Sequence, residues 1–210
     1  MEYEEIISIE QNKTKIEYGV IHGDNTIVFI KSGSGGNCYG YENKYLKIAK
    51  SLHEKYGCSV IAGSNPLGYH NDMVMEMNFI RDYAKEHELK DYKVYYLGHS
   101  SGAALGIINA YKYPEIKKLA CINSPLMINP HLLLSGIKQF NGEKMFLVYG
   151  SNDLSFRMVK IYSELESERI QFILFNGIDH NFTGCLELFL ELPDVLFFGD
   201  ALSLKNVKVD

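Results

Sequence analysis

The feature that most constrains the fold is a repeated unit in which a short apolar run precedes a segment with helical periodicity. Short continuous apolar runs are typical of strands buried on both faces, and strands that alternate with helices form parallel sheets. We expect strands at 26–32, 58–64, 93–98, 117–123, 144–150 and 169–177. We expect helices around 45–52, 73–88, 101–113, 156–167 and 182–192, with one short helix in 124–140.

Two further strands are expected before this repeat. Residues 4–10 and 14–21 alternate between apolar and polar side chains, which predicts a hairpin at one edge of the sheet. The sequence therefore predicts a single α/β domain over residues 1–210, with an eight-stranded, mostly parallel sheet and helices on both faces. Right-handed crossovers would bring the carboxyl ends of the parallel strands to one edge, where ligands bind in such folds.

Composition and charge exclude several classes of protein. The chain has a net charge of −5 and no block of Lys and Arg, which argues against an extended nucleic-acid surface. The acidic start MEYEEIISIE is not a signal peptide, and the apolar stretch at 185–198 is too short and too charged to span a membrane. We expect a cytoplasmic protein.

The cysteines do not predict a metal site or a disulfide framework. They form no CxxC pair, and no His lies at ligand spacing from any of them. Most lie in or beside predicted strands or helices, where a free Cys behaves as a small hydrophobic residue. The four are Cys38, Cys58, Cys121 and Cys185.

The segment YYLGHSSGA contains a candidate catalytic residue, Ser100. Ser100 follows a predicted strand and precedes a predicted helix, with Gly98 and Gly102 two residues to either side. A sharp strand-to-helix turn that exposes a serine requires small residues at these two positions. The alternative is a Gly-Ser loop in which Ser100 or Ser101 only caps the helix.

This pattern resembles the nucleophile elbow of the α/β-hydrolase superfamily, and the strand-helix order is similar over nearly the whole chain. The resemblance implies a nucleophilic Ser100, an acid after the seventh strand and a histidine after the eighth. Many members insert a cap between the sixth and seventh strands. Here only about twenty residues separate them, which implies an essentially cap-less member.

Both partners are present at the expected places. Asp153 follows the run MFLVYG, and His180 follows FILFNG. His180 can take the proton of Ser100 and return it to a leaving group, and a carboxylate on its other ring nitrogen fixes the tautomer. Asp153 also fits an Asx turn or a helix cap. Asp179 is a weaker rival acid because it directly precedes His180, and we expect His99 to pack under the turn.

The superfamily supplies two backbone donors to the oxyanion. One is the N–H of the residue after the nucleophile, here Ser101. The other comes from the loop after the third strand, where Gly33-Ser34-Gly35 resembles the Gly-x-Gly of a His-Gly-x-Gly segment. This favours Ser34, with Gly33 and Gly35 left open because Ser32 replaces the usual His. A merely flexible glycine loop is the alternative.

The resemblance to the superfamily implies a carboxylesterase or thioesterase that cleaves a small to medium ester-type substrate, with an amide also open. A serine triad with backbone oxyanion donors needs no cofactor or metal. The alternatives are a hydrolase-fold binding protein without activity and an acyltransferase with the same triad. Apolar side chains expected near an open site are Tyr39, Tyr41, Leu126, Met127 and Phe182.

Overall fold

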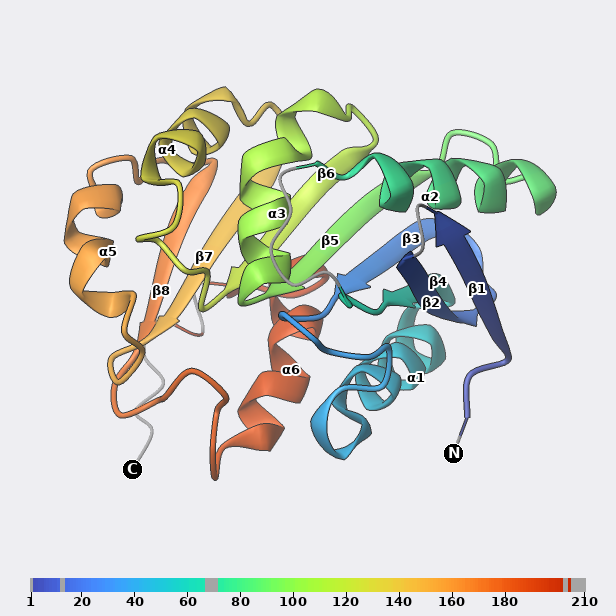
Figure 1. Ribbon diagram of the computed structural model, residues 1–210, viewed down its shortest axis with the longest axis horizontal. Coiled ribbons are helices and arrows are strands. Elements are labelled where there is room, and N and C mark those ends of the chain that lie inside the picture. Colours follow the sequence, from blue (N-terminus) through green and yellow to red (C-terminus); the bar gives the residue numbers. More distant parts are fainter. Residues whose placement is uncertain (1, 12–13, 67–71, 202–203, 205–210) are drawn as a thin grey trace.

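The protein is a mixed sheet covered by helices on both faces (Figure 1). The computed structural model describes residues 2–11, 14–66, 72–201 and 204. The sheet has eight strands in the order β1-β2-β4-β3-β5-β6-β7-β8. They are β1 (Glu5–Gln11), β2 (Thr14–Ile21), β3 (Asp24–Lys31), β4 (Cys58–Gly63), β5 (Lys93–His99), β6 (Ile116–Ile122), β7 (Lys144–Gly150) and β8 (Ile170–Phe175).

The pairing confirms the predicted edge hairpin and the mostly parallel sheet. Strand β2 pairs antiparallel with β1 and with β4. From β4 through β8, all neighbours are parallel. The carboxyl ends of β3 to β8 therefore meet along one edge of the sheet.

The helices divide between the two faces of the sheet. One core joins the sheet to α2, α3, α4 and α5, and the other joins it to α1 and α6 (Figure 1). The helices are α1 (Lys44–Tyr56), α2 (Val74–Glu86), α3 (Ser101–Asn109), α4 (Pro130–Gln139), α5 (Phe156–Ser163) and α6 (Leu186–Phe197), with 3-10 turns η1 (Tyr41–Asn43) and η2 (Ala110–Lys112).

The last helix differs from its predicted bounds. Helix α6 begins four residues later than expected and continues through Pro193, which lies inside it. A proline in a helix interior removes one backbone hydrogen bond and costs about 3 kcal/mol. The turn that follows stays helical because Leu196 and Phe197 are buried in the core with α1.

No cap domain lies between β6 and β7. Residues 123–143, all of them described, contain α4 and short loops. Helix α4 packs beside α3, and a Cβ at Gly136 would lie 2.0 Å from the Ile107 carbonyl oxygen. The segment therefore lies against the helical layer, and the edge of the sheet stays open.

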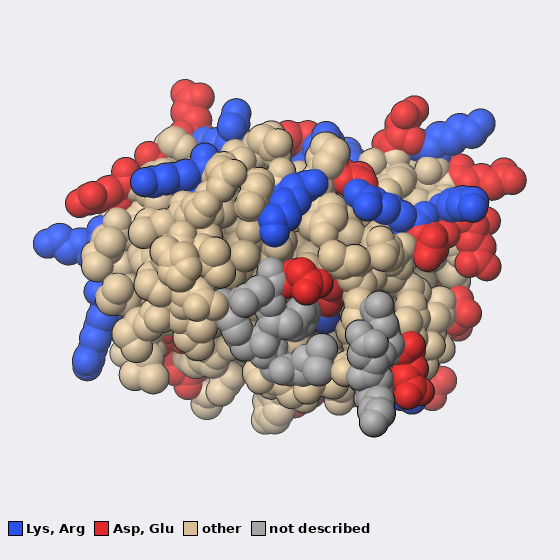
Figure 2. All heavy atoms as spheres, turned by 45° about the horizontal axis from the view of Figure 1, so that its top comes forward, with Lys and Arg blue, Asp and Glu red and all other residues tan. Residues whose placement is uncertain are grey.

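The surface carries charges of both signs. On the face shown in Figure 2, acidic and basic side chains are interspersed and do not gather into one large patch. The longest helices, α1 and α2, have 13 residues each. Within the described residues, no helix combines the length and the hydrophobicity that a membrane span requires.

Candidate active site

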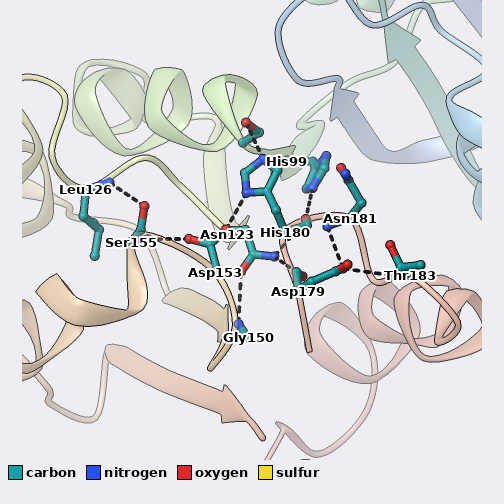
Figure 3. A network of polar contacts seen from close by, with 11 residues as sticks. His99, Asn123, Leu126, Gly150, Asp153, Ser155, Asp179, His180, Asn181 and Thr183 are labelled. Atoms are coloured by element: carbon teal, nitrogen blue, oxygen red, sulfur yellow. Dashed lines mark hydrogen bonds and ion pairs between the residues drawn. The ribbon is translucent and has the colours of Figure 1, made fainter. Parts of the chain in front are cut away.

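Three loops at the carboxyl edge of the sheet bring Ser100, Asp153 and His180 together. Ser100 lies between β5 and α3, Asp153 follows β7, and His180 follows β8. Nε2 of His180 is 3.0 Å from Oγ of Ser100, and Nδ1 of His180 contacts Oδ2 of Asp153. Figure 3 shows the contact between His180 and Asp153 and the residues around it. The serine, imidazole and carboxylate are thus connected in one line.

The turn that presents Ser100 is strained. Its φ of 55° and ψ of −122° are unusual for a residue with a side chain. The turn also brings backbones into close contact, since a Cβ at Gly98 would lie 2.5 Å from Cα of Ala103. A Cβ at Gly102 would lie 2.5 Å from the Lys31 carbonyl oxygen. Glycine is therefore required on both sides of Ser100, as the sequence predicts.

The serine side chains do not cap helix α3. Ser100 makes no side-chain capping bond, and its hydroxyl faces His180 instead. The hydroxyl of Ser101 accepts a hydrogen bond of 3.0 Å from Nδ2 of Asn65. The capping alternative therefore does not describe either residue.

Asp153 is buried and uses both carboxylate oxygens. Oδ1 accepts the N–H of Ser155 at 2.6 Å, and Oδ2 contacts the imidazole of His180. The Asx turn considered from the sequence thus coexists with the pairing. A carboxylate at Nδ1 holds the proton of neutral His180 on that nitrogen and leaves Nε2 free to accept from Ser100.

The rival acid, Asp179, is occupied elsewhere. Its Oδ1 accepts the N–H groups of Thr183 at 2.9 Å and Asn181 at 3.1 Å (Figure 3). These bonds lower the pKa of the Asp179 carboxyl, and the bond to Thr183 has the largest effect. Asp179 shapes the turn that carries His180 and does not contact the imidazole.

His99 lies under the turn, as expected. Its Nε2 donates to the carbonyl oxygen of His180 at 3.0 Å, and its ring meets Phe189 edge-on. Burial, followed by the positive charge of Lys44, lowers the pKa of His99 to about 3. His99 is therefore a neutral donor that supports the backbone of His180.

Asn123 is a positioning residue that the sequence analysis missed. It follows β6 in a left-handed conformation, with a φ of 47°. Its Nδ2 donates to the carbonyl oxygens of Asp179 at 3.1 Å and His180 at 3.0 Å, and its Oδ1 accepts the N–H of Gly150 at 3.0 Å. One amide thus joins the loops that follow β6, β7 and β8.

The loop after β3 approaches the same point. A Cβ at Gly33 would lie 3.1 Å from Cβ of Ser100. The N–H of Gly35 donates to the Asn65 carbonyl at 2.9 Å, which removes Gly35 as a donor to substrate. Among the described residues, the N–H groups of Gly33, Ser34 and Ser101 donate to no backbone carbonyl, although that of Gly33 faces the hydroxyl oxygen of Tyr45. Ser34 and Ser101 thus remain the favoured oxyanion donors, with Gly33 still open.

Ser32 stands where the superfamily commonly has His. Its hydroxyl is within hydrogen-bond distance of the carbonyl oxygens of Gly36, at 3.1 Å, and Gly63, at 3.2 Å. Nδ2 of Asn65, a second residue missed from the sequence, donates to the Ser32 carbonyl at 3.1 Å. These contacts hold the glycine loop in place without the histidine.

Two cavities flank His180. One of about 310 Å³ is lined by Ser34, Ser100, His180 and the side chains of Tyr41 and Lys44. This first cavity borders a larger outer cavity of about 650 Å³, which Tyr41, Lys44 and Phe182 line and which His180 does not.

The second cavity, of about 380 Å³, lies on the Asp153 side and includes Met127 and Leu154. Of the other expected apolar residues, Leu126 is buried in the core, and the ring centroid of Tyr39 lies 5.3 Å from that of Tyr3. Neither is among the residues that line these cavities.

No family model matches this sequence, and no curated protein matches it. Solved structures do share its fold. Est1E from Butyrivibrio proteoclasticus matches with a TM-score of 0.67 and 15% identity, over 89% of this chain and 95% of its own. An alpha-beta serine hydrolase homologue from Coxiella burnetii matches with a TM-score of 0.68 and 20% identity, over 91% and 96%.

A third structure bears on the missing cap. XC6422 from Xanthomonas campestris, described as an a/b serine hydrolase without lid, matches with a TM-score of 0.64 and 13% identity. The match covers 97% of this chain and 96% of that one. Together with the sheet order and the strained turn after β5, these likenesses identify the fold. The chain has the α/β-hydrolase fold, in a form without a cap.

Proposed function

We propose that the protein is a serine hydrolase that cleaves an ester, a thioester or an amide through an acyl-enzyme on Ser100. The observation that carries this proposal is the line of contacts from Ser100 through His180 to the buried Asp153. Est1E, which has the same fold, is also known with ferulic acid bound. The open edge and the cavities beside His180 suit a small to medium substrate.

The first half-reaction forms the acyl-enzyme. Nε2 of His180 takes the hydroxyl proton as Oγ of Ser100 attacks the scissile carbonyl. The N–H groups of Ser34 and Ser101 stabilise the oxyanion, and Asp153 stabilises the imidazolium. His180 then gives the proton to the leaving group.

The second half-reaction restores the enzyme. Water enters from the open edge, His180 removes a proton from it, and the acyl–Ser100 bond breaks. The acid product leaves, and His180 returns the proton to Oγ of Ser100. Every proton transfer in this cycle passes through one imidazole nitrogen.

The test combines a covalent probe with a panel of esters. We expect a fluorophosphonate to label the protein and p-nitrophenyl esters of increasing acyl length to be hydrolysed. Both signals should vanish in Ser100→Ala. They should persist in Ser163→Ala, because the Ser163 hydroxyl of the wild type only donates to the Lys160 carbonyl at the end of α5. Asp153→Asn should stay folded and lose up to about ten-thousandfold in turnover, through the wrong tautomer of His180.

Other results would change the assignment. Folded protein that reacts with neither probe nor esters would instead be a binding protein. Product analysis with added alcohols or amines would reveal an acyltransferase, since the acyl group would then appear on the acceptor. Near-normal turnover in Asp153→Asn would remove Asp153 from the site.

A further inference from the structure

Lys44 is a buried cation for which the proposed mechanism has no use. It is the first residue of α1 and only 6% exposed. Within the part of the chain that the structure describes, its ammonium group has no hydrogen bond and no ion pair. Its contacts are with aromatic rings, since Nζ lies 4.0 Å from the ring centroid of Phe189 and 5.2 Å from that of Tyr45.

This placement destabilises the free protein in two ways. An ammonium that leaves water without a partner loses solvation, which cation–π contacts restore only in part. A positive charge at the first residue of a helix also opposes the helix dipole. Burial accordingly lowers the pKa of Lys44 to about 8. An anion beside Lys44 would offset both effects.

The side chain lies where a substrate would lie. Lys44 lines the cavity of about 310 Å³ together with Ser100, His180 and Ser34. Its charge also contributes to the lowered pKa of His99, directly beneath the turn. Lys44 thus borders the same space as the reacting groups.

The neighbouring charges limit the kind of anion. The outer cavity, which Lys44 also lines, carries the carboxylates of Glu42 and Glu187. These would repel a second negative charge beyond the first. A single carboxylate fits this arrangement better than a phosphate or a polyanion.

The cavities also separate the two parts of an ester. The acyl carbon bonds to Ser100, and its oxygen faces the glycine loop, so the rest of the acyl group enters the cavity that both line. The leaving group receives its proton from His180. His180 lines both cavities and the acyl group fills the first, so the leaving group departs toward the cavity of about 380 Å³, whose described lining includes His180 and Met127 but not Ser100.

We propose that Lys44 binds a carboxylate on the acyl part of the substrate, so that the preferred substrates are half-esters of dicarboxylic acids. This inference rests on the proposed serine hydrolase function. In the reaction, the bond from Oγ of Ser100 to the acyl carbon forms and the ester C–O bond breaks. The proton of Ser100 passes through His180 to the leaving alcohol. The distal carboxylate stays ionised beside Lys44 until water releases the diacid.

The experiment compares a charged acyl group with a neutral one of the same shape. The substrates are the mono-p-nitrophenyl esters of succinic, glutaric, adipic and suberic acid, each beside the ester whose free carboxylate is replaced by a carboxamide. Rates without enzyme are subtracted. At pH 7 we expect kcat/KM to favour the charged ester by about tenfold or more at the best chain length, as a charge-assisted hydrogen bond allows.

The variants are Lys44→Met, which keeps the length and removes the charge, and Lys44→Arg, which keeps the charge. Lys44→Met should abolish the preference, so that each charged ester and its carboxamide partner have the same kcat/KM, and it should melt at the same or a higher temperature. Lys44→Arg should retain part of the preference. Equal preference in wild type and Lys44→Met, or no preference in wild type at any length, would overturn the proposal.

A second pair of substrates tests the acyl assignment. In 4-acetoxybenzoate and 4-acetoxybenzamide, the charge lies on the leaving group instead. A preference that depends on Lys44 and appears only in this pair would overturn the assignment to the acyl side. If the serine hydrolase proposal itself is wrong, the result is different. Neither neutral nor charged esters are then cleaved, and Ser100→Ala has the same rates as the wild type.

Discussion

At the scale of single residues, His180 is positioned through its own backbone. Its carbonyl oxygen accepts from Nε2 of His99 and from Nδ2 of Asn123, both at 3.0 Å. Two donors on one carbonyl leave the imidazole little freedom except rotation about its side-chain bonds. In the proposed mechanism, the ring would then turn between Ser100 and a leaving group without moving the main chain.

Replacing Asn123 tests this positioning. Asn123→Gly keeps the left-handed backbone while removing the bonds to Asp179, His180 and Gly150. Because a buried N–H then lacks its acceptor, we expect the free energy of unfolding to fall by about 1–3 kcal/mol, measured in urea. We expect kcat to fall with little change in KM, and labelling by the fluorophosphonate to slow in parallel.

Asn123→Asp is the matched variant, since it keeps the acceptor for Gly150 and loses both donors. Its kcat should fall as well. Wild-type kcat in both variants, with only stability reduced, would make Asn123 a structural residue without influence on the imidazole.

The sequence could identify the residues of the proposed mechanism but not those that hold them in place. Ser100, Asp153 and His180 each follow an apolar run, so the common edge was foreseeable. Asn123 acts on carbonyl oxygens 56 and 57 residues away. Backbone acceptors leave no mark in a sequence, and only the folded chain brings them within reach of an amide.

At the scale of secondary structure elements, the β5–α3 turn is pressed against β3. The ideal Cβ position at Gly102 lies 2.5 Å from the Lys31 carbonyl oxygen and 2.6 Å from that of Ser32. The first turn of α3 therefore touches the start of the glycine loop. Any side chain at residue 102 would push Ser100 and the glycine loop apart.

Gly102→Ala should lower both stability and activity. Overpacking of this kind costs about 1–3 kcal/mol, which urea unfolding measures, and the displaced loop should reduce kcat. The control is Gly57→Ala, at the end of α1, where φ is 68° and no atom lies within 4 Å of the added carbon. It should lose about 1–2 kcal/mol through backbone strain alone and keep its kcat. Unchanged turnover in Gly102→Ala would show that the contact with β3 is not needed for catalysis.

Helix α6 shows where local signals mislead. A proline and an acidic residue at 193 and 194 favour an end to the helix at Leu192, yet the helix continues to Phe197. Burial of Leu196 and Phe197 stabilises by about 1.5–3 kcal/mol each, which together is at least as large as the cost of the proline. That burial depends on α1, more than a hundred residues earlier in the chain.

At the scale of the whole molecule, the chain reverses its direction across the parallel part of the sheet once, at β4. Helix α1 joins β3 to β4 on one face, and α2 joins β4 to β5 on the other, which places β3 between β4 and β5. With right-handed crossovers, a change of face is a change of direction across the sheet. An apolar stripe on a helix does not reveal which face it will cover, so the sequence predicted a parallel sheet but not its order.

The acid stability of the molecule should depend on His99. Its pKa is lowered to about 3 in the folded protein, chiefly by burial, and is about 6.5 in an unfolded chain. Below pH 6.5 the unfolded chain binds a proton that the native ring does not accept until the pH nears 3. Between these values, His99 should reduce the free energy of unfolding by up to about 1.4 kcal/mol for each unit that the pH falls.

Urea unfolding of wild type and His99→Gln at intervals from pH 4 to pH 7.5 measures this contribution. Carboxylates titrate alike in both proteins, and the glutamine amide can still donate to the His180 carbonyl. The stability of wild type relative to the variant should fall steadily below pH 6.5 and stay constant above it. Two parallel curves would mean that His99 takes up a proton in the native state.

The hydrogen bonds of Asn123, which join the loops after β6, β7 and β8, affect how these loops can open. The loops after β7 and β8 are also joined directly, since the N–H of Asn152 donates to the Ile178 carbonyl at 2.9 Å and that of Ser151 to Phe175 at 2.9 Å. Movement of one loop would break its hydrogen bonds to its neighbours. We therefore expect the loops to open and close as one cooperative unit, so that Ser100, Asp153 and His180 stay aligned only while the whole cluster is closed.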